Sequence, residues 1–255
     1  MVNDFAALIA AGRPVEGELV IDAHAHLGEW EGYYVPQPEP TQLVDCMDRY
    51  GIGKAWISAY AALSSDFVYG NDLVAEAVRA HPDRFVGYAT PSANYPEVVV
   101  AELERCEALG MTGIKLHQWC QGIAEDSERW CPVYEWADAR GKVIMAHSWG
   151  TPEYLGRVAG QHRRVAFLIG HLGMDFADVV RRHDNVYTTT TFVPGPGAIA
   201  AAVKAFGAEK ILFGSDMPDL DPSLNMGPLL TACISDEDKR LILGRNMERL
   251  VAEHG

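Results

Sequence analysis

The segment Val20–His26 reads VIDAHAH and ends in two histidines separated by one alanine. Its apolar and β-branched residues predict a strand, and successive side chains of a strand point to opposite faces. His24 and His26 therefore point to the same face. A divalent metal ion binds neutral imidazole nitrogens, so this pair predicts half of a metal site at the C-terminal end of the strand.

Strand-like runs alternate with helix-like runs from Leu19 onward, which is the order that produces a parallel sheet covered by helices. The eight predicted strands are Leu19–His26, Lys54–Tyr60, Phe85–Pro91, Gly113–His117, Val143–Ser148, Val165–Gly170, Val186–Thr191 and Ile211–Ser215. A chain of 255 residues also has the length of one (β/α)₈ TIM barrel, which takes about 250 residues.

Apolar spacing near 3.6 predicts a helix in each connection between strands. The predicted helices are Thr41–Tyr50, Asn71–Ala80, Pro96–Leu109, Cys131–Arg140, Pro152–Ala159, Phe176–His183 and Gly197–Phe206. Ser235, followed by three acidic residues, is a favourable helix start, so Ser235–Glu253 is predicted to close the ring. No repeat or linker divides the chain, and we expect one domain over residues 1–255, with residues 1–18 as an N-terminal helical cap.

Further metal-compatible side chains stand at the ends of later predicted strands. His147 ends the fifth strand, His171 follows the sixth and Asp216 follows the eighth. Active sites of parallel barrels are built from the C-terminal ends of their strands, so residues far apart in sequence meet there. The sequence therefore predicts that these side chains gather with His24 and His26.

Six motifs stand along the chain: IDAHAHLG (21–28), GIKLH (113–117), VIMAHS (143–148), IGHLG (169–173), ILFGSDMP (211–218) and ILGRNMERL (242–250). In these motifs the chain resembles the amidohydrolase superfamily, and within it the amidohydrolase-2 branch that includes aminocarboxymuconate-semialdehyde decarboxylase. The resemblance implies that His24, His26, His147 and Asp216 bind one divalent metal ion and that His171 is an acid/base.

Metal chemistry agrees with these roles. A divalent ion lowers the pKa of bound water toward about 7, and Asp216 and His171 are suited to manage protons during attack on a carbonyl. Three imidazoles and a carboxylate suit zinc best, while manganese, iron and cobalt tolerate the same ligands.

The fourth predicted strand leaves alternatives open. Lys115 and His117 alternate with apolar residues and should face the interior together. Some superfamily members carboxylate a lysine on this strand to bridge two metals. The resemblance to mononuclear enzymes favours instead a buried charge partner for Lys115, such as Asp22. For His117 it favours a polar contact to the substrate or to a metal-bound water.

Loops after the strands are rich in aromatic residues, which provide flat apolar faces for a planar ligand. We expect substrate contacts from Trp30, Trp119 and Trp149, and from Arg129 as the main loop cation. The scarcity of cations and the acidic loop Asp219–Asp221 disfavour a polycarboxylate substrate. The sequence therefore favours hydrolysis of an ester, lactone or amide of a small aromatic or apolar substrate, with non-oxidative decarboxylation of an aromatic or unsaturated acid as the alternative, and a non-catalytic binding barrel as a third possibility.

Composition excludes other classes. A formal net charge of −14 argues against nucleic-acid binding, which needs clustered basic residues. The five cysteines are scattered without a C-x-x-C pair and predict reduced thiols. The N-terminus lacks the basic start of a signal peptide and no apolar run reaches about 18 residues, so we expect a cytoplasmic protein without membrane contact. The family resemblance makes a homodimer plausible.

Overall fold

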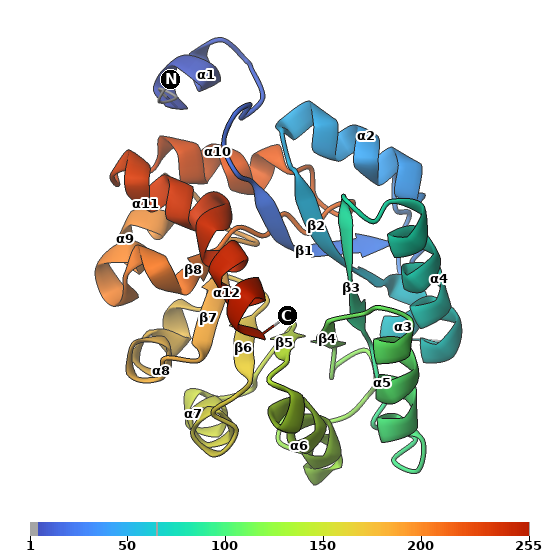
Figure 1. Cartoon of the computed structure of the whole chain (residues 1–255). Coiled ribbons are helices and arrows are strands. Elements are labelled where there is room, and N and C mark those ends of the chain that lie inside the picture. The colour runs from blue at the N-terminus through green and yellow to red at the C-terminus, as the bar shows by residue number, and fades with distance from the viewer. Residues whose placement is uncertain (1–4, 65, 255) are drawn as a thin grey trace.

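The computed structural model describes residues 5–64 and 66–254, and it is a (β/α)₈ barrel. Eight parallel strands are hydrogen-bonded in chain order, and helices surround them (Figure 1). All eight predicted strands are present, with ends shifted by up to three residues. The strands are β1 (Ile21–Leu27), β2 (Lys54–Ala59), β3 (Phe85–Ala89), β4 (Gly113–Leu116), β5 (Val143–Ala146), β6 (Ala166–Ile169), β7 (Val186–Thr189) and β8 (Ile211–Leu212).

Each of the seven predicted connecting helices is also present. They are α2 (Pro40–Tyr50), α4 (Phe67–Ala80), α5 (Val99–Ala108), α6 (Cys131–Arg140), α7 (Pro152–Gln161), α8 (Ala177–Arg182) and α9 (Pro196–Phe206). Short elements that were not predicted are α3 (Tyr60–Leu63) and the 3-10 turns η1 (Glu128–Trp130), η2 (Met174–Phe176) and η3 (Ala208–Lys210). Helix α4 begins four residues before its predicted start because the Asp66 carboxylate accepts a hydrogen bond from the backbone N–H of Tyr69 at 3.0 Å.

The barrel closes between its first and last strands. The backbone N–H of Ala23 donates to Phe213, that of Asp216 donates to His24, and that of His26 donates to Met217, at 2.7–2.8 Å. A β-bulge interrupts β1 between Asp22 and Ala25, where β1 has one more residue than β2 opposite it. Because of the bulge, the side chains of His24 and His26 face the interior of the barrel, as that of Ala23 does before it, while Ala25 and Leu27 face the surrounding helices.

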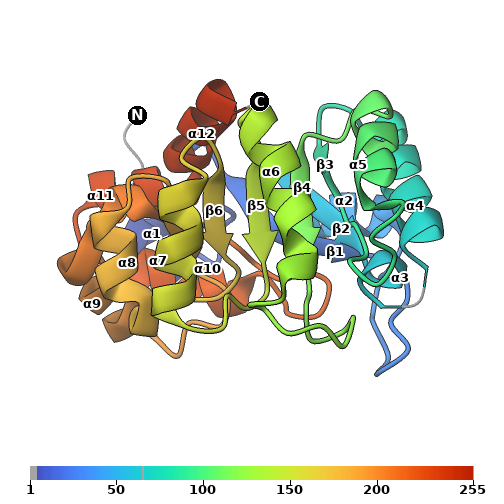
Figure 2. The same cartoon turned by 90° about the horizontal axis from the view of Figure 1, so that it is seen from below.

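The C-terminal segment covers the N-terminal end of the barrel. After α10 (Ser223–Thr231), Ser235 caps α11 (Asp236–Arg240) through a reciprocal capping box with Asp238, which confirms the predicted start. A π-helical turn η4 (Leu241–Arg245) leads into α12 (Asn246–His254), whose Met247 and Leu250 pack into the lower core. Figures 1 and 2 show α12 across this end, with the strand arrows pointing away from it.

The N-terminal segment is less helical than predicted. Helix α1 covers Phe5–Ala10 and packs on α10, whereas residues 11–18 form turns and coil, and residues 1–4 lie outside the described residues. The ring of Phe5 lies under the cationic groups of Lys239 and Arg240, 5.7 and 5.2 Å from its centroid. This contact attaches the segment to α11.

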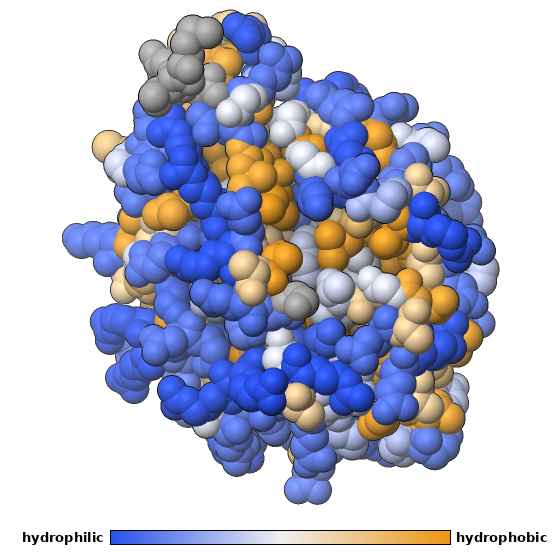
Figure 3. All heavy atoms as spheres, viewed as in Figure 1, coloured by the Kyte–Doolittle hydropathy of each residue, from blue (hydrophilic) through white to orange (hydrophobic). Residues whose placement is uncertain are grey.

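The surface around α12 is largely hydrophilic, with smaller hydrophobic patches between the helices (Figure 3). Among the described residues, we find no helix whose length and apolar character would let it span a bilayer.

A glycine sets the contact between α3 and α4. A β-carbon added to Gly70 in α4 would overlap the backbone nitrogen of Ala62 in α3, and a backbone atom cannot move aside as a flexible side chain can. Gly70 thereby lets α4 lie against α3, the element that begins with Tyr60 at the C-terminal end of β2.

Gly70→Ala should destabilise the fold by about 1–3 kcal/mol, because the added methyl group overpacks the α3–α4 contact. For a chain of this size each kcal/mol lowers Tm by roughly 2–4 °C, which thermal unfolding will measure. The matched control is Gly197→Ala in α9, where an added β-carbon meets nothing within 4 Å. The control should be stabilised by about 0.5–1 kcal/mol, since alanine is the better helix former. An unchanged Tm for Gly70→Ala would contradict this account of the contact.

Candidate metal centre

The predicted functional residues lie at the C-terminal end of the barrel, opposite α12. In Figure 2 the loops after β1 and β4 project beyond the strand arrowheads at this end. His24 and His26 come from β1, and Asp216 follows β8, the neighbour that closes the barrel. The closure described above therefore brings residues about 190 positions apart in sequence to adjacent backbone positions.

His24, His26 and Asp216 form a buried group whose ligand atoms all lie within 4.8 Å of one another. Nε2 of His24 lies 3.4 Å from Oδ1 of Asp216, and Nε2 of His26 lies 3.2 Å from the same oxygen. Two ligands that share one tetrahedral ion at about 2.0–2.1 Å are separated by roughly 3.4 Å. The donor types and their spacing thus fit one divalent metal ion.

Hydrogen bonds behind the imidazoles orient them. Nδ1 of His24 lies 2.8 Å from the carbonyl oxygen of Gly170, which can only accept, so Nδ1 carries the proton and Nε2 has the lone pair. The hydroxyl of Thr191 lies 3.2 Å from the same Nδ1, and the hydroxyl of Ser58 lies 3.0 Å from Nδ1 of His26. Such contacts fix the ring planes of metal-binding histidines.

Asp216 is held as a carboxylate. Burial opposes its charge, but the imidazoles of His24 and His26 and the ammonium of Lys115 outweigh burial and hold the pKa of Asp216 well below its usual value. Its backbone has a left-handed φ of 63°, which is uncommon for a residue other than glycine. The strained conformation and the bond from its N–H to the carbonyl of His24 at 2.8 Å fix the position from which the carboxylate projects.

Lys115 does not pair with Asp22, and this expectation was wrong. Asp22 accepts hydrogen bonds from the N–H of His24 at 3.0 Å and from the N–H and hydroxyl of Ser215. Nζ of Lys115 lies 2.5 Å from Nε2 of His24 instead. Burial lowers the pKa of Lys115 to about 8, although the nearby Asp216 carboxylate counteracts part of the shift.

His147, His117 and His171 form a second group of rings beside the first. Nδ1 of His147 lies 3.1 Å from Nε2 of His171, and the rings of His147 and His117 stack at 4.1 Å. His147 lies outside the group of three potential ligands, so its role as a ligand stays a prediction. Burial first, and His171 second, lower the pKa of His147 to about 3, while burial also lowers the pKa of His171.

The residues expected to contact substrate have different surroundings. His117 is buried, and the ring of Trp119 lies 6.3 Å from its ring, in a residue that is 77% exposed. Trp30 is half-buried and packs on Tyr60 at 5.3 Å. Arg129 is exposed on η1 in the loop after β4.

The expectation that Trp149 contacts substrate was wrong, because its side chain belongs to the core and is 0% exposed. It packs on Phe167 and Tyr134, and its indole N–H donates to the carbonyl of Leu168 at 3.0 Å. These contacts satisfy its polar atom and cover its faces, so Trp149 is a packing residue without a face for substrate.

Tyr60 and Thr189 lie near the candidate ligands and were not predicted, whereas Phe192 is one of the aromatic residues of the loops after the strands. The ring of Tyr60 stacks on His26 at 4.8 Å, and the ring of Phe192 lies 5.2 Å from His171 with 59% of the residue exposed. Thr189 donates to the same Gly170 carbonyl that orients His24, at 2.7 Å. Their positions at the C-terminal ends of β2 and β7 are the signal that could have identified them.

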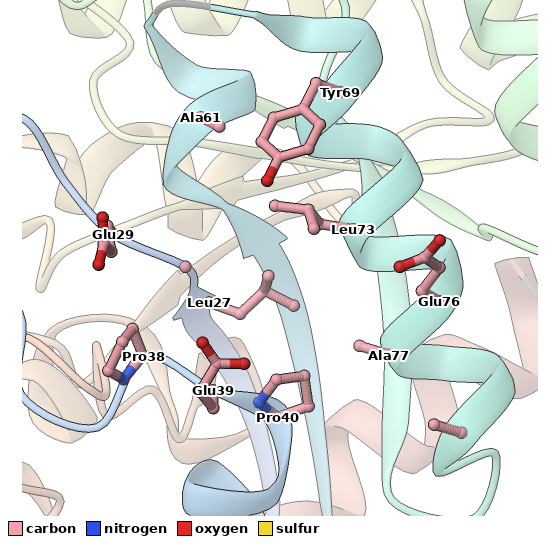
Figure 4. A pocket seen from close by; sticks show the side chains of 12 residues that line it. Leu27, Glu29, Pro38, Glu39, Pro40, Ala61, Tyr69, Leu73, Glu76 and Ala77 are labelled. Carbon is pink, nitrogen blue, oxygen red and sulfur yellow. The ribbon is translucent and has the colours of Figure 1, made fainter.

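A separate hollow of about 440 Å³ lies on the outer side of β1 (Figure 4). Its walls come from the end of β1, the start of α2 and one side of α4, and three glutamates line it: Glu29, Glu39 and Glu76. None of the predicted metal ligands lines it, so it is distinct from the candidate centre.

Known proteins resemble this chain in sequence and in three-dimensional structure. Over 82 residues, 32% of the chain, it is 30% identical to 2-amino-3-carboxymuconate-6-semialdehyde decarboxylase of Dictyostelium discoideum, and the match spans 23% of that relative. Among solved structures, 2,6-dihydroxybenzoate decarboxylase from Rhizobium superimposes with a TM-score of 0.77 at 18% identity, covering 93% of this chain and 100% of the other.

A dihydroxybenzoic acid decarboxylase from a Polaromonas species, solved with manganese and the inhibitor 2-nitroresorcinol, has a TM-score of 0.77 at 19% identity and covers 92% of this chain and 97% of the other. At these identities the structural likeness establishes the fold alone. The model of the amidohydrolase-2 family, described as amidohydrolase, matches residues 21–252. A match over this share of the sequence shows that the chain belongs to the amidohydrolase family.

Proposed function

We propose that this protein is a metal-dependent, non-oxidative decarboxylase of a small aromatic carboxylic acid. The observation that carries the proposal is the convergence of His24, His26 and Asp216 on one point at the mouth of the barrel, beside His171. The sequence alone favoured hydrolysis. The three relatives named above are decarboxylases, and they support the alternative reaction better.

Exposed aromatic rings beside the histidines also support an aromatic substrate. Phe192 lies against His171 and Trp119 lies near His117, and both leave much of their surface open to solvent. A planar ring bound between such side chains gains apolar burial and stacking.

The reaction adds a proton to the carbon that bears the carboxylate and then breaks the carbon–carbon bond, releasing CO₂ without consuming water. A bound divalent ion supplies positive charge that attracts the carboxylate and stabilises developing negative charge. In our proposal His24, His26, His147 and Asp216 hold that ion. His171 moves the proton, since it is half-buried beside these residues and an imidazole can both accept and donate a proton.

Manganese or zinc would suit these ligands, because imidazole and carboxylate accept both ions. The Polaromonas decarboxylase holds manganese, which favours that ion over the zinc expected from the ligand set alone. We also propose a mononuclear site in which Lys115 is not carboxylated.

The metal-loaded protein should convert a hydroxybenzoate to the corresponding phenol and CO₂. Turnover in H₂¹⁸O, followed by mass spectrometry, distinguishes the two reactions, because decarboxylation leaves the phenol unlabelled whereas hydrolysis of an aryl ester or lactone labels a product carboxylate. Cleavage of esters or lactones with label incorporation, and no CO₂ from any aromatic acid, would establish hydrolysis instead.

His171→Asn should lower kcat by about 10²–10⁴-fold, the usual contribution of a general acid/base, with the metal content unchanged. The control is His81→Asn, directly after the C-terminal end of α4 on the opposite end of the barrel, which should retain full activity. Steady-state kinetics and elemental analysis of both variants provide the comparison. Normal turnover by the His171 variant would remove this residue from the mechanism.

Elemental analysis of the purified protein should find about one ion per chain. Asp216→Asn should weaken metal affinity by at least roughly 10–100-fold, the range known for residues that merely orient ligands. Asp221→Asn, in the same loop but hydrogen-bonded to Tyr50 at 2.6 Å, should bind the ion like the parent. A ratio near two ions per chain would instead favour a carboxylated Lys115 that bridges them.

A further inference from the structure

Two neighbouring threonines form a closed hydrogen-bond network with one of the predicted metal ligands. The hydroxyl of Thr189 donates to the carbonyl oxygen of Gly170 at 2.7 Å and lies 3.2 Å from the hydroxyl of Thr191. Nδ1 of His24 lies 2.8 Å from the Gly170 oxygen and 3.2 Å from the Thr191 hydroxyl. Each of these four polar groups therefore contacts the next, and the last contacts the first.

The network connects strands that are not neighbours in the sheet. His24 belongs to β1, which pairs with β2 and with the segment after β8, whereas Gly170 follows β6 and Thr189 ends β7. Backbone pairing thus does not fix the distance between His24 and its partners. The side chains must fix it, and all of them are buried: Thr189 and Thr191 are 0% exposed and His24 is 1% exposed, so water does not readily replace a lost partner.

Two glycines give the network its room. A β-carbon added to Gly214, after β8, would lie 2.7 Å from the hydroxyl oxygen of Thr191 and 3.1 Å from the β-carbons of His24 and Thr189. A β-carbon added to Gly170 would lie 3.3 Å from Cε1 of His24. The backbone therefore encloses the imidazole and both hydroxyls closely, and a change of one group displaces the others.

The proton positions explain why this network matters for a metal ion. The Gly170 carbonyl can only accept, so the proton of the His24 ring is on Nδ1, and the Thr191 oxygen can accept from the same N–H. The lone pair of the ring is then on Nε2, which lies 3.4 Å from Oδ1 of Asp216. A rotation of the ring would move Nε2 away from the point that the candidate ligands share.

We propose that Thr189 and Thr191 are positioning residues that act as one unit on His24 and set the affinity of the candidate centre for its metal ion. The inference rests on the metal dependence in the proposed function. Both threonines act through His24 and not on the reacting atoms. Thr190, between them, is different, because its hydroxyl bonds to the backbone of Gly214.

Calorimetric titration of the metal-free protein with Mn²⁺ tests the role without measuring turnover. Thr189→Val and Thr191→Val should each weaken Mn²⁺ binding by roughly 10- to 100-fold, the range known for groups that orient metal ligands. Thr191→Ser retains the hydroxyl and should bind Mn²⁺ like the parent.

Thr190→Val is the matched control. It removes a buried, hydrogen-bonded hydroxyl from the same segment, so its Tm should fall as the Tm of the other two valine variants does. Its Mn²⁺ affinity should nevertheless equal that of the parent. A loss of affinity in Thr190→Val as large as in the other two would show that the affinity follows stability, and the positioning role would be wrong.

A double-mutant cycle tests whether the two threonines act as one unit. If they do, the variant with both valines should bind Mn²⁺ little more weakly than either single variant, because the first substitution already breaks the network. Independent contributions would multiply instead, and that result would contradict the single unit.

The outcomes separate this inference from the proposed function. If the valine variants bind Mn²⁺ like the parent while the parent releases CO₂ from an aromatic acid, the positioning role is wrong and the function stands. If affinity falls as expected but the parent decarboxylates no aromatic acid, the positioning role is right and the reaction is wrong. A parent that binds neither Mn²⁺ nor Zn²⁺ would overturn both. Should Thr191→Val fail to fold, Thr189→Val against Thr190→Val decides the question.

Discussion

The candidate centre depends on backbone pairing between β1 and the segment after β8. The N–H of Asp216 bonds to the carbonyl of His24, and the N–H of His26 bonds to the carbonyl of Met217, so the potential ligands lie on neighbouring backbones before any metal is considered. The same bonds close the barrel. Fold and site therefore share one constraint, because a chain that could not close at β1 and β8 would lose both.

Closure alone would not aim both histidines inward. Alternation along β1 places Ile21 and Ala23 in the inner core, and it would direct the even-numbered residues outward. The β-bulge between Asp22 and Ala25 shifts this alternation by one residue. Asp22 then accepts a hydrogen bond from Ser215 and links β1 to the segment after β8. His24 contacts Lys115 and the Gly170 carbonyl.

The order and type of the elements could be predicted from the sequence, because alternation of strand and helix patterns and a length suited to one barrel agree with each other. The approximate positions of His24, His26 and Asp216 followed from the rule that strand ends converge. The bulge could not be predicted, since one additional residue in VIDAHAH leaves the apolar pattern unchanged. The hydrogen bonds of Ser58 and Thr191 to the imidazoles likewise depend on tertiary packing.

Two aromatic residues show where strand-end reasoning fails. Trp149 was expected to face substrate, but β5 ends at Ala146, so alternation no longer determines its direction, and its indole N–H finds a partner in the core. Tyr60 was treated as the last residue of a strand. It begins α3 instead, and the close contact at Gly70 holds that short helix where the phenol ring can stack on His26.

The acidic character of the chain is compatible with an anionic substrate because distance and salt limit its effect. Charges separated by more than about 8 Å are largely screened at physiological ionic strength, so most of the net charge of −14 has little influence at the mouth of the barrel. Under the proposed function, the local charges matter more than the net charge. Lys115 and a divalent ion would attract one carboxylate, while Asp219 would repel a second one placed beside it. Binding of a nucleic acid needs an extended basic surface, and one buried lysine and one metal ion do not provide it. The acidic net charge therefore does not conflict with the proposed binding of a small monocarboxylate.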